Sequence, residues 1–252
     1  MGLRALRRDR AARTGPELFL LERAFADCLE RLALMQRRFD RALLIGCPDA
    51  GWPQRLREFA ADVDVRDPGP EFARAAGGTP IIEDAWEPPD RCYELVLAIG
   101  TLDTVNALPP ALGLIRHAMA KDALFLGALS GGETLPRLRA AMRAADAVTG
   151  AASPHVHPRI EPGALAHLLS QAGFIDAVVD VDRVQVSYAS LDRLVADLRA
   201  MGATNMLSAR PGPLGKAERA AAAQAFTEAG DGKKTTEILE ILHFAAFTPR
   251  DG

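Results

Sequence analysis

An α/β architecture, built on a doubly wound and mostly parallel sheet, is what the residue pattern predicts. Short apolar segments typical of buried strands alternate with segments of helical periodicity, in units of roughly 20 to 30 residues. One of them, residues 93–100, is apolar without alternation, as expected for a strand covered on both faces of the sheet. The composition, 48% hydrophobic and 25% charged, is that of a folded globular protein and excludes a disordered chain.

Residues 1–40 are expected to form a helical extension in front of this domain. Apolar side chains recur there at steps of three and four residues, for example at Leu21, Phe25 and Leu29. The period then changes to that of strands, so the α/β domain is expected to span residues 41–252.

The elements of this domain follow one another along the chain. The first two strands end at turns rich in Gly and Pro, which are the strongest local signals for a turn. A stretch near residues 188–235 interrupts the alternation and is expected to be an insertion. Strands are predicted at residues 41–46, 63–67, 80–84, 93–100, 123–129, 177–182, 184–188 and 237–248, and helices at 52–61, 109–119, 135–147, 162–172, 191–201 and 216–229.

Charge, cysteine content and hydropathy narrow the class of protein. Lys and Arg number 30 against 33 Asp and Glu, a net charge of −3, which excludes a polycation that would bind nucleic acid through its overall charge. No apolar run approaches the ~18 residues of a membrane span, so no transmembrane segment is expected. The three cysteines, Cys28, Cys47 and Cys92, are too few and too scattered for a disulfide scaffold and indicate a reducing compartment. A cytoplasmic protein is expected, and its oligomeric state is left open.

The turn after the first strand is the first candidate for a binding site. It runs from Gly46 to Gly51 and contains Cys47 and Pro48. In doubly wound folds this turn is the usual cradle for a nucleotide, because glycine lets the backbone turn sharply and approach the ligand closely. Pro48 donates no N–H to such a ligand. The turn is therefore either a nucleotide cradle or an ordinary tight turn.

Carboxylates end the next two predicted strands. Asp64 and Asp67 lie about 20 residues after the glycine turn, where a carboxylate commonly binds the ribose hydroxyls of a nucleotide. Asp67 is the better placed, because it is the last residue before a Pro-Gly turn. Glu83 and Asp84 end the third strand, where an adenine amino group could find an acceptor. The alternative for each is a solvated carboxylate at the end of a strand.

Five motifs stand out from the fourth strand onward. They are Thr101-Leu-Asp-Thr-Val-Asn106 followed by Leu108-Pro109, Gly131-Gly-Glu-Thr-Leu135, Ser153-Pro-His155, Gln171-Ala-Gly-Phe174, and Asp197-Leu-Arg-Ala-Met-Gly202 leading to Asn205. With the order of elements, these motifs resemble class I S-adenosylmethionine-dependent methyltransferases. The resemblance is narrower to the alphaproteobacterial and mitochondrial family that includes the respiratory complex I assembly factor acting as an arginine hydroxylase. The chain resembles the malonyl-carrier-protein methyltransferases of biotin synthesis more distantly. The resemblance to the assembly-factor family covers nearly the whole chain.

The resemblance implies a seven-stranded methyltransferase sheet of the Rossmann-like type and S-adenosylmethionine as cofactor. It also implies transfer to a protein or small-molecule acceptor, with a role near respiratory-complex assembly. The residues that would bind the cofactor are Gly46, Cys47, Pro48, Asp67, Asp84, Ala85, Gly100 and Thr101.

The glycine turn departs from the pattern of this family. The family's first strand usually ends in an acid followed by Gly-x-Gly-x-Gly, whereas here Leu44 or Ile45 takes the acid position and Pro48 replaces the second glycine. Asp103 and Thr104 replace the usual His-Trp pair. A degenerate, non-catalytic binding or assembly module is therefore the alternative to an enzyme. A nicotinamide-dependent oxidoreductase is disfavoured, because no G-x-G-x-x-G motif follows the first strand.

Polar residues of the family motifs are the candidates for chemistry. Methyl transfer needs a base only when the acceptor carries a proton. Glu133, directly after the fifth strand, ranks first, although a carboxylate there could also stabilise the first turn of the following helix. His155 and His157 without a neighbouring ligand cluster do not predict a metal site. The full set is Glu133, Asp103 and His155 as catalytic residues, and Asn106, Tyr188 and Asn205 as substrate-binding residues.

Overall fold

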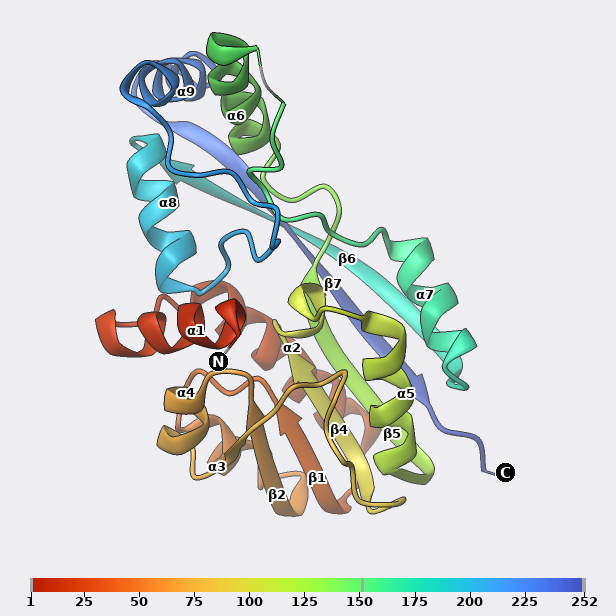
Figure 1. The fold of residues 1–252 in the computed structure, drawn as a ribbon. Coiled ribbons are helices and arrows are strands. Elements are labelled where there is room, and N and C mark those ends of the chain that lie inside the picture. Colours follow the sequence, from red (N-terminus) through yellow and green to blue (C-terminus); the bar gives the residue numbers. More distant parts are fainter. Residues whose placement is uncertain (1, 151, 251–252) are drawn as a thin grey trace.

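The computed structural model describes residues 2–150 and 152–250, and its centre is a seven-stranded sheet in the order β3-β2-β1-β4-β5-β7-β6 (Figure 1). β1, β2, β3, β4 and β5 pair in parallel, and β7 runs antiparallel to both β5 and β6. This confirms the predicted doubly wound, mostly parallel α/β fold. The strands are β1 (Phe39–Ile45), β2 (Ala60–Asp67), β3 (Thr79–Pro80), β4 (Tyr93–Ile99), β5 (Met119–Ser130), β6 (Ile175–Tyr188) and β7 (Thr235–Phe247).

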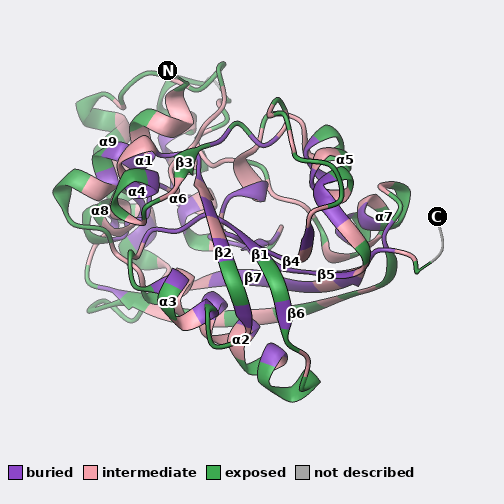
Figure 2. Cartoon of the chain, turned by 90° about the horizontal axis from the view of Figure 1, so that it is seen from below, coloured by how far each residue is buried: buried purple, intermediate pink, exposed green. Residues whose placement is uncertain are grey.

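Helices cover both faces of the sheet because its central strands are apolar on both sides. α2 (Phe19–Met35) and α3 (Trp52–Leu56) pack on one face, where the rings of Phe25 and Trp52 stack with their centroids 4.3 Å apart. α5 (Leu108–Ala118) and α7 (Pro162–Gln171) pack on the other, around Phe125. Figure 2 shows the buried residues concentrated on the central strands, while β6 at the edge alternates between exposed and half-buried residues.

A third cluster of apolar side chains lies beyond the main sheet. β6 and β7 extend past the parallel strands (Figure 1), and Tyr188 and Leu239 near their far ends pack against helices. Phe226 is fully buried within this cluster. The three helices are α6 (Pro136–Thr149), α8 (Leu191–Ala200) and α9 (Lys216–Glu228), of which α8 and α9 lie between β6 and β7 in the chain.

The edge formed by the carboxyl ends of the parallel strands is covered by the start of the chain. α1 (Leu3–Thr14) lies across this edge beside α4 (Pro70–Ala75), and the short helix η1 (Leu102–Thr104) follows β4. Residues 1–40 are therefore not one continuous helical segment. Gly15, at φ +93°, and Pro16 end α1, and α2 begins only at Phe19, because neither residue favours the interior of a helix.

Three other predicted elements differ in length from those observed. The helix predicted at residues 52–61 ends at Leu56, because β2 already begins at Ala60. The third strand comprises only Thr79 and Pro80, so the acids predicted at its end lie in a loop. The strands predicted on either side of Arg183 form the single strand β6, because β7 pairs with it from end to end. Over the described ranges, no helix combines the length and the apolar character needed to cross a bilayer.

Candidate functional site

The glycine turn after β1 is closely packed against the neighbouring strand. Gly46 adopts φ +84°, and a Cβ atom at this position would lie 2.3 Å from the carbonyl oxygen of Ile99 at the end of β4. Only glycine fits both the backbone conformation and the available space. Gly46 donates its N–H to the carbonyl oxygen of Arg66, which fixes the turn against the end of β2. The turn is thus a rigid backbone cradle at the edge where doubly wound folds bind nucleotides.

Asp67 is the last residue of β2, and its side chain is fully buried beside this turn. Its carboxylate accepts hydrogen bonds from the backbone N–H groups of Cys47, at 2.7 Å, and Gly69, at 2.6 Å. The guanidinium of Arg8 on α1 then donates to both oxygens, from Nε at 2.7 Å and from Nη2 at 2.5 Å. Four donors therefore saturate this carboxylate.

A second arginine of α1 reaches the acid after β3. Arg4 donates from its two terminal nitrogens to Glu83, at 2.5 and 2.7 Å, and Glu83 is fully buried. The same guanidinium contacts the carbonyl oxygen of Thr101, at 2.5 Å, and the hydroxyl oxygen of Thr104, at 3.0 Å. Arg4 and Arg8 thus cap the carboxyl ends of β2 and β4 from one helix.

The other predicted cofactor residues surround these two arginines at different depths. Cys47 and Thr101 are buried, and burial, followed by the Asp67 charge, raises the pKa of the Cys47 thiol. This thiol therefore stays protonated and is no nucleophile. Asp84 is half-buried and accepts the backbone N–H of Ala107 at 2.9 Å. Pro48 is buried, Gly100 is half-buried at φ +61°, and Ala85 is exposed.

The chemical groups of this turn and of the neighbouring carboxylates suit the nucleoside of S-adenosylmethionine. The space that the nucleoside would need, however, is already filled. The strand-end carboxylate and the glycine turn are the groups that bind ribose and a close-lying ligand backbone in this fold. Arg8 and Arg4, however, contact the carboxylates of Asp67 and Glu83 that the nucleoside would use. The nucleoside fits here only if α1 moves.

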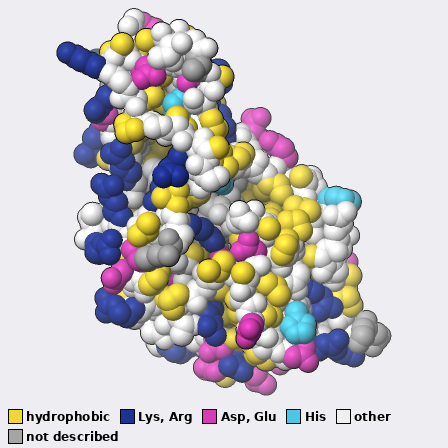
Figure 3. All heavy atoms as spheres, in the orientation of Figure 1, with side chains coloured by type: hydrophobic (Ala, Val, Ile, Leu, Met, Phe, Trp, Pro, Cys, Tyr) yellow, Lys and Arg dark blue, Asp and Glu magenta, His cyan; other side chains and the backbone are white. Residues whose placement is uncertain are grey.

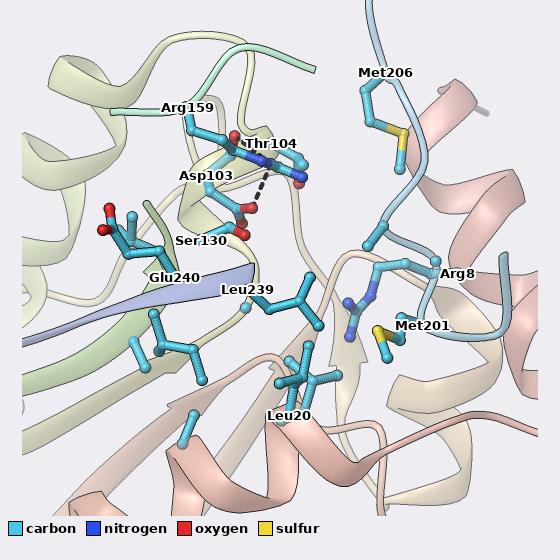
Figure 4. Close-up of a pocket in the computed structure, with 18 of the residues that line it drawn as sticks. Arg8, Leu20, Asp103, Thr104, Ser130, Arg159, Met201, Met206, Leu239 and Glu240 are labelled. Atoms are coloured by element: carbon cyan, nitrogen blue, oxygen red, sulfur yellow. Dashed lines mark hydrogen bonds and ion pairs between the residues drawn. The ribbon is translucent and has the colours of Figure 1, made fainter. Parts of the chain in front are cut away.

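Beyond the two arginines lies a cavity of about 80 Å³ between α1, α2 and the ends of β4, β5 and β7. Figure 4 shows Arg159, Asp103, Ser130 and Glu240 gathered on one wall, with Arg8 on the opposite wall. Apolar side chains of Leu20, Leu239, Met201 and Met206 line the remainder. This volume holds a few water molecules or the end of a side chain, and is too small for a nucleoside.

The polar wall of this cavity contains buried atoms without hydrogen-bond partners. Arg159 contacts the Oδ2 atom of Asp103 through one terminal nitrogen, and both side chains are more than nine-tenths buried. Among the described residues, Asp103 Oδ1, Arg159 Nε and Glu240 Oε2 accept or donate no hydrogen bond, although Arg183 Nε approaches the last at 3.1 Å. Unsatisfied buried groups are uncommon in folded proteins, and their clustering here indicates a place for a polar ligand group or water.

A larger cavity of about 560 Å³ adjoins the first one. It lies between α6, α8 and the loops 153–159 and 203–214, and Arg159 and Ala203 line both cavities. Its floor is apolar, with leucines from α6 and α8. Arg199, His155 and His157 supply polar groups at its walls.

Of the remaining predicted catalytic and substrate residues, His155 and Asn205 come together at the larger cavity, whereas Glu133, Asn106 and Tyr188 do not line it. Glu133 is exposed and its backbone N–H faces the Glu240 carboxylate at 3.4 Å. Asn106 is exposed, while Asn205 lines the larger cavity and donates to the carbonyl oxygen of Pro154.

His155 and Tyr188 are each held by a neighbouring acid. His155 bonds Asp146 at 2.8 Å, and this hydrogen bond lowers the pKa of the Asp146 carboxyl group. Tyr188 is buried in the α6–α8–α9 cluster, where burial, followed by the Asp197 charge, raises the pKa of its hydroxyl group. Of the predicted catalytic set, only Asp103 lines the smaller cavity.

Four charged residues of the site were not predicted from the sequence: Arg4, Arg8, Arg159 and Glu240. The start of the chain is rich in arginine, but nothing in the local pattern indicates which acids these arginines contact. Glu240 had a usable signal, since it is an acid inside an apolar strand, where a charge needs a partner. Within residues 2–150 and 152–250, no three His, Cys, Asp or Glu side chains come together as a metal site.

Comparisons with known proteins agree with this fold. The chain is 32% identical over 219 residues to arginine-hydroxylase NDUFAF5, mitochondrial, of Rattus norvegicus, covering 83% of this chain and 64% of that protein. It is 30% identical over 217 residues to the malonyl-(acyl-carrier protein) O-methyltransferase of Halorhodospira halophila, covering 81% of this chain and 72% of that protein. The chain thus spans slightly less than two thirds of the NDUFAF5 relative. No protein-family model matches it.

Solved structures with the same fold are more distant in sequence. The YcgJ protein of Bacillus subtilis superposes with a TM-score of 0.57 at 11% identity, over 86% of this chain and 97% of that chain. Phosphoethanolamine N-methyltransferase 2 of Haemonchus contortus, in complex with S-adenosyl-L-methionine, superposes with a TM-score of 0.52 at 11% identity, over 88% of this chain and 52% of that chain. Together with the sequence relatives, the fold places the chain in the class I S-adenosylmethionine-dependent methyltransferase superfamily, among the relatives of the NDUFAF5 arginine hydroxylases and the malonyl-(acyl-carrier protein) O-methyltransferases.

Proposed function

We propose that this protein binds S-adenosylmethionine at the carboxyl ends of β1, β2 and β4 and transfers a methyl group to a protein acceptor. The observation that carries the proposal is the buried Asp67 carboxylate beside the Gly46 turn. A strand-end carboxylate and a glycine turn at this edge are the two features with which doubly wound folds hold a nucleoside. The fold of the solved methyltransferases supports the same site.

The chain's own residues divide the work in this proposal. Asp67 accepts the ribose hydroxyls, and Glu83 and Asp84 lie on the adenine side. When bound, the cofactor supplies an electrophilic methyl group, so the protein chiefly aligns the acceptor and removes a proton where the acceptor carries one. Asp103 is the candidate that lines the smaller cavity, where its free Oδ1 atom can accept a hydrogen bond from an acceptor group.

The acceptor enters, in this proposal, through the larger cavity between α6 and α8. Its apolar floor suits the stem of a side chain, and Arg159 lies where the two cavities meet. The mitochondrial relative is named as an arginine hydroxylase, which favours a protein acceptor and a role in respiratory complex I assembly. The second group of relatives is named for transfer to a carrier-protein-bound malonyl group, which also favours an acceptor carried by a protein.

Binding of S-adenosylhomocysteine, followed by calorimetry, tests this proposal. We expect binding by the unmodified protein. Arg8→Ala/Asp67→Asn should bind about 1–3 kcal/mol more weakly than Arg8→Ala, because Asn keeps the shape of the side chain but loses its charge, and Arg8 is absent from both proteins. The matched control is Asp62→Asn, an exposed acid on the same strand, which should bind as the unmodified protein does. No binding at millimolar ligand would contradict the proposal.

A binding or assembly module without transfer activity is the second candidate. It is favoured by a specific observation, the bidentate contact between Arg8 and Asp67 at the expected ribose site, together with Pro48 in the turn. An absence of binding even when Arg8 is replaced by Ala would favour this candidate.

A further inference from the structure

We propose that α1 is an internal competitor of the cofactor, and that its two arginines must leave Asp67 and Glu83 before a nucleoside can bind. This inference rests on the proposed binding of S-adenosylmethionine. It adds a conformational step to that function, because the same carboxylates cannot bind the arginines of α1 and the nucleoside at the same time.

Arg8 carries the main part of this contact. Its side chain is 5% exposed, both of its donors to Asp67 lie within 2.7 Å of the carboxylate, and its guanidinium lies 5.2 Å above the centre of the Phe72 ring. A guanidinium in this position presents paired N–H donors to the carboxylate, as a ribose presents its pair of hydroxyl groups. Arg8 therefore mimics the ligand that Asp67 would hold.

Arg4 repeats the same contact one helical turn away. Arg4 and Arg8 are four residues apart, so both side chains leave α1 on the same side. The Arg4 guanidinium contacts both the Glu83 carboxylate beyond β3 and the carbonyl oxygen of Thr101 after β4. The two contacts together close the edge of the sheet over the Gly46 turn.

The connection that follows α1 allows it to move as a unit. Gly15 adopts φ +93°, has no other atom within 4 Å of a Cβ built on it, and is followed by Pro16, and both residues are exposed. A short exposed link of this kind absorbs the backbone change of a hinge without disturbing the core. α1 is also the most polar of the longer helices. Besides Arg4 and Arg8, its contacts include Asp9, which accepts the Glu71 N–H at 2.9 Å, and Arg7, which donates to the carbonyl oxygen of Asn205.

Competition of this kind lowers the apparent affinity for cofactor by the fraction of molecules in which α1 is released. Replacing Arg8 should therefore strengthen cofactor binding. The opposite result is expected if Arg8 itself holds the cofactor, so the sign of the change distinguishes the two roles. Asp67 variants cannot make this distinction, because Asp67 serves Arg8 and the ribose alike.

Calorimetric titration with S-adenosylhomocysteine compares the unmodified full chain with Arg8→Ala and with Arg4→Ala/Arg8→Ala. We expect about tenfold tighter binding for Arg8→Ala, in the range usual for coupled sites, and a larger gain for the double variant. The control is Arg10→Ala. Arg10 is exposed on the same helix and forms no ion pair within the described ranges. Figure 3 shows Lys and Arg side chains gathered on the flank of the molecule where α1 and α8 lie in Figure 1.

Hydrogen exchange of the unmodified chain provides a readout that needs no variant to fold. On saturation with S-adenosylhomocysteine, the amides of α1 should exchange faster, while those of β1 and β4 should not. Unchanged or slower exchange in α1, or weaker binding by Arg8→Ala, would overturn the competition. Equal affinity in all variants contradicts the competition alone, whereas no binding in any of them contradicts the proposed function as well.

Discussion

Two buried arginine–carboxylate pairs lie at the same edge of the sheet and differ in how completely they are satisfied. In the Arg8–Asp67 pair, two guanidinium nitrogens and two backbone N–H groups saturate the carboxylate. In the Arg159–Asp103 pair a single guanidinium nitrogen contacts one carboxylate oxygen and the backbone carbonyl oxygen of Asp103, and atoms on both side chains remain without a partner among the described residues. Both pairs border the same cavity, but only the second leaves buried polar atoms there without a partner among the described residues.

This difference indicates that the first ion pair stabilises the fold, whereas the second has hydrogen-bonding atoms available for a ligand. A buried charge is costly unless its partner and hydrogen bonds compensate for the loss of water. The Arg8–Asp67 pair meets that condition within the chain, so a ligand must displace Arg8 to gain access. The hydrogen bonds of the Arg159–Asp103 pair do not fully compensate its buried charges. A polar acceptor group or water can therefore supply the missing hydrogen bonds without displacing any side chain.

The largest effect on stability is expected from Asp67→Ala. It leaves Arg8 and two backbone N–H groups buried without their acceptor, and should lower the free energy of unfolding by about 3–5 kcal/mol. Urea denaturation measures this, with Asp62→Ala as the exposed control, expected within about 0.5 kcal/mol of the unmodified protein. A loss below about 1 kcal/mol for Asp67→Ala would mean that this pair does not stabilise the fold.

A smaller effect is expected from Arg159→Met. Asp103 then loses its one charged contact, but it faces a cavity that can admit water, so the free energy of unfolding should fall by only about 1–3 kcal/mol. In the proposed function, the KM for the acceptor should rise while cofactor affinity stays constant. If Arg159→Met were as destabilising as Asp67→Ala, the distinction between the two pairs would be lost.

The smallest effect on stability is expected from the titration of His157, whose charge is influenced by Arg159. Burial, followed by the Arg159 charge, lowers the pKa of His157 from its ordinary value of 6.5. The folded state therefore favours neutral His157, and the stability that this contributes is present above pH 6.5 and lost as the pH falls through the folded pKa. His157→Gln should lose less stability on acidification than the unmodified protein.

Unfolding curves at a series of pH values measure this effect, with exposed His117→Gln as the control. Arg159→Met should also raise the pKa of His157, which NMR titration reports. A His157 pKa that does not respond to this change would show that the two side chains are not electrostatically coupled.

Much of the fold could be predicted from periodicity. β4 is apolar at nearly every position because helices cover both faces of the sheet, and this run identified the strand correctly. Short elements were harder: β3 has two residues, too few for a pattern to distinguish strand from loop. β6 is an edge strand with many exposed positions, so its pairing with β7, rather than its own sequence, defines its length.

The candidate site was predicted only in part, for a related reason. The sequence placed Asp67 at the end of a strand, and the structure has it there. Glu133, ranked first from its position after the fifth strand, has an exposed side chain, because position along the chain does not determine where a side chain points. Whether the predicted residues act in catalysis or binding stays a prediction for the experiments above.

Local periodicity and backbone constraints were enough to predict a doubly wound, mostly parallel sheet, the succession of strands and helices along the chain, and a glycine turn with acids beyond it. Only the tertiary structure decided that Arg8 meets Asp67 and that Arg159 meets Asp103. Those partners lie 59 and 56 residues apart in the chain. Charge pairing over such separations depends on how helices dock on the sheet, and no local pattern encodes it.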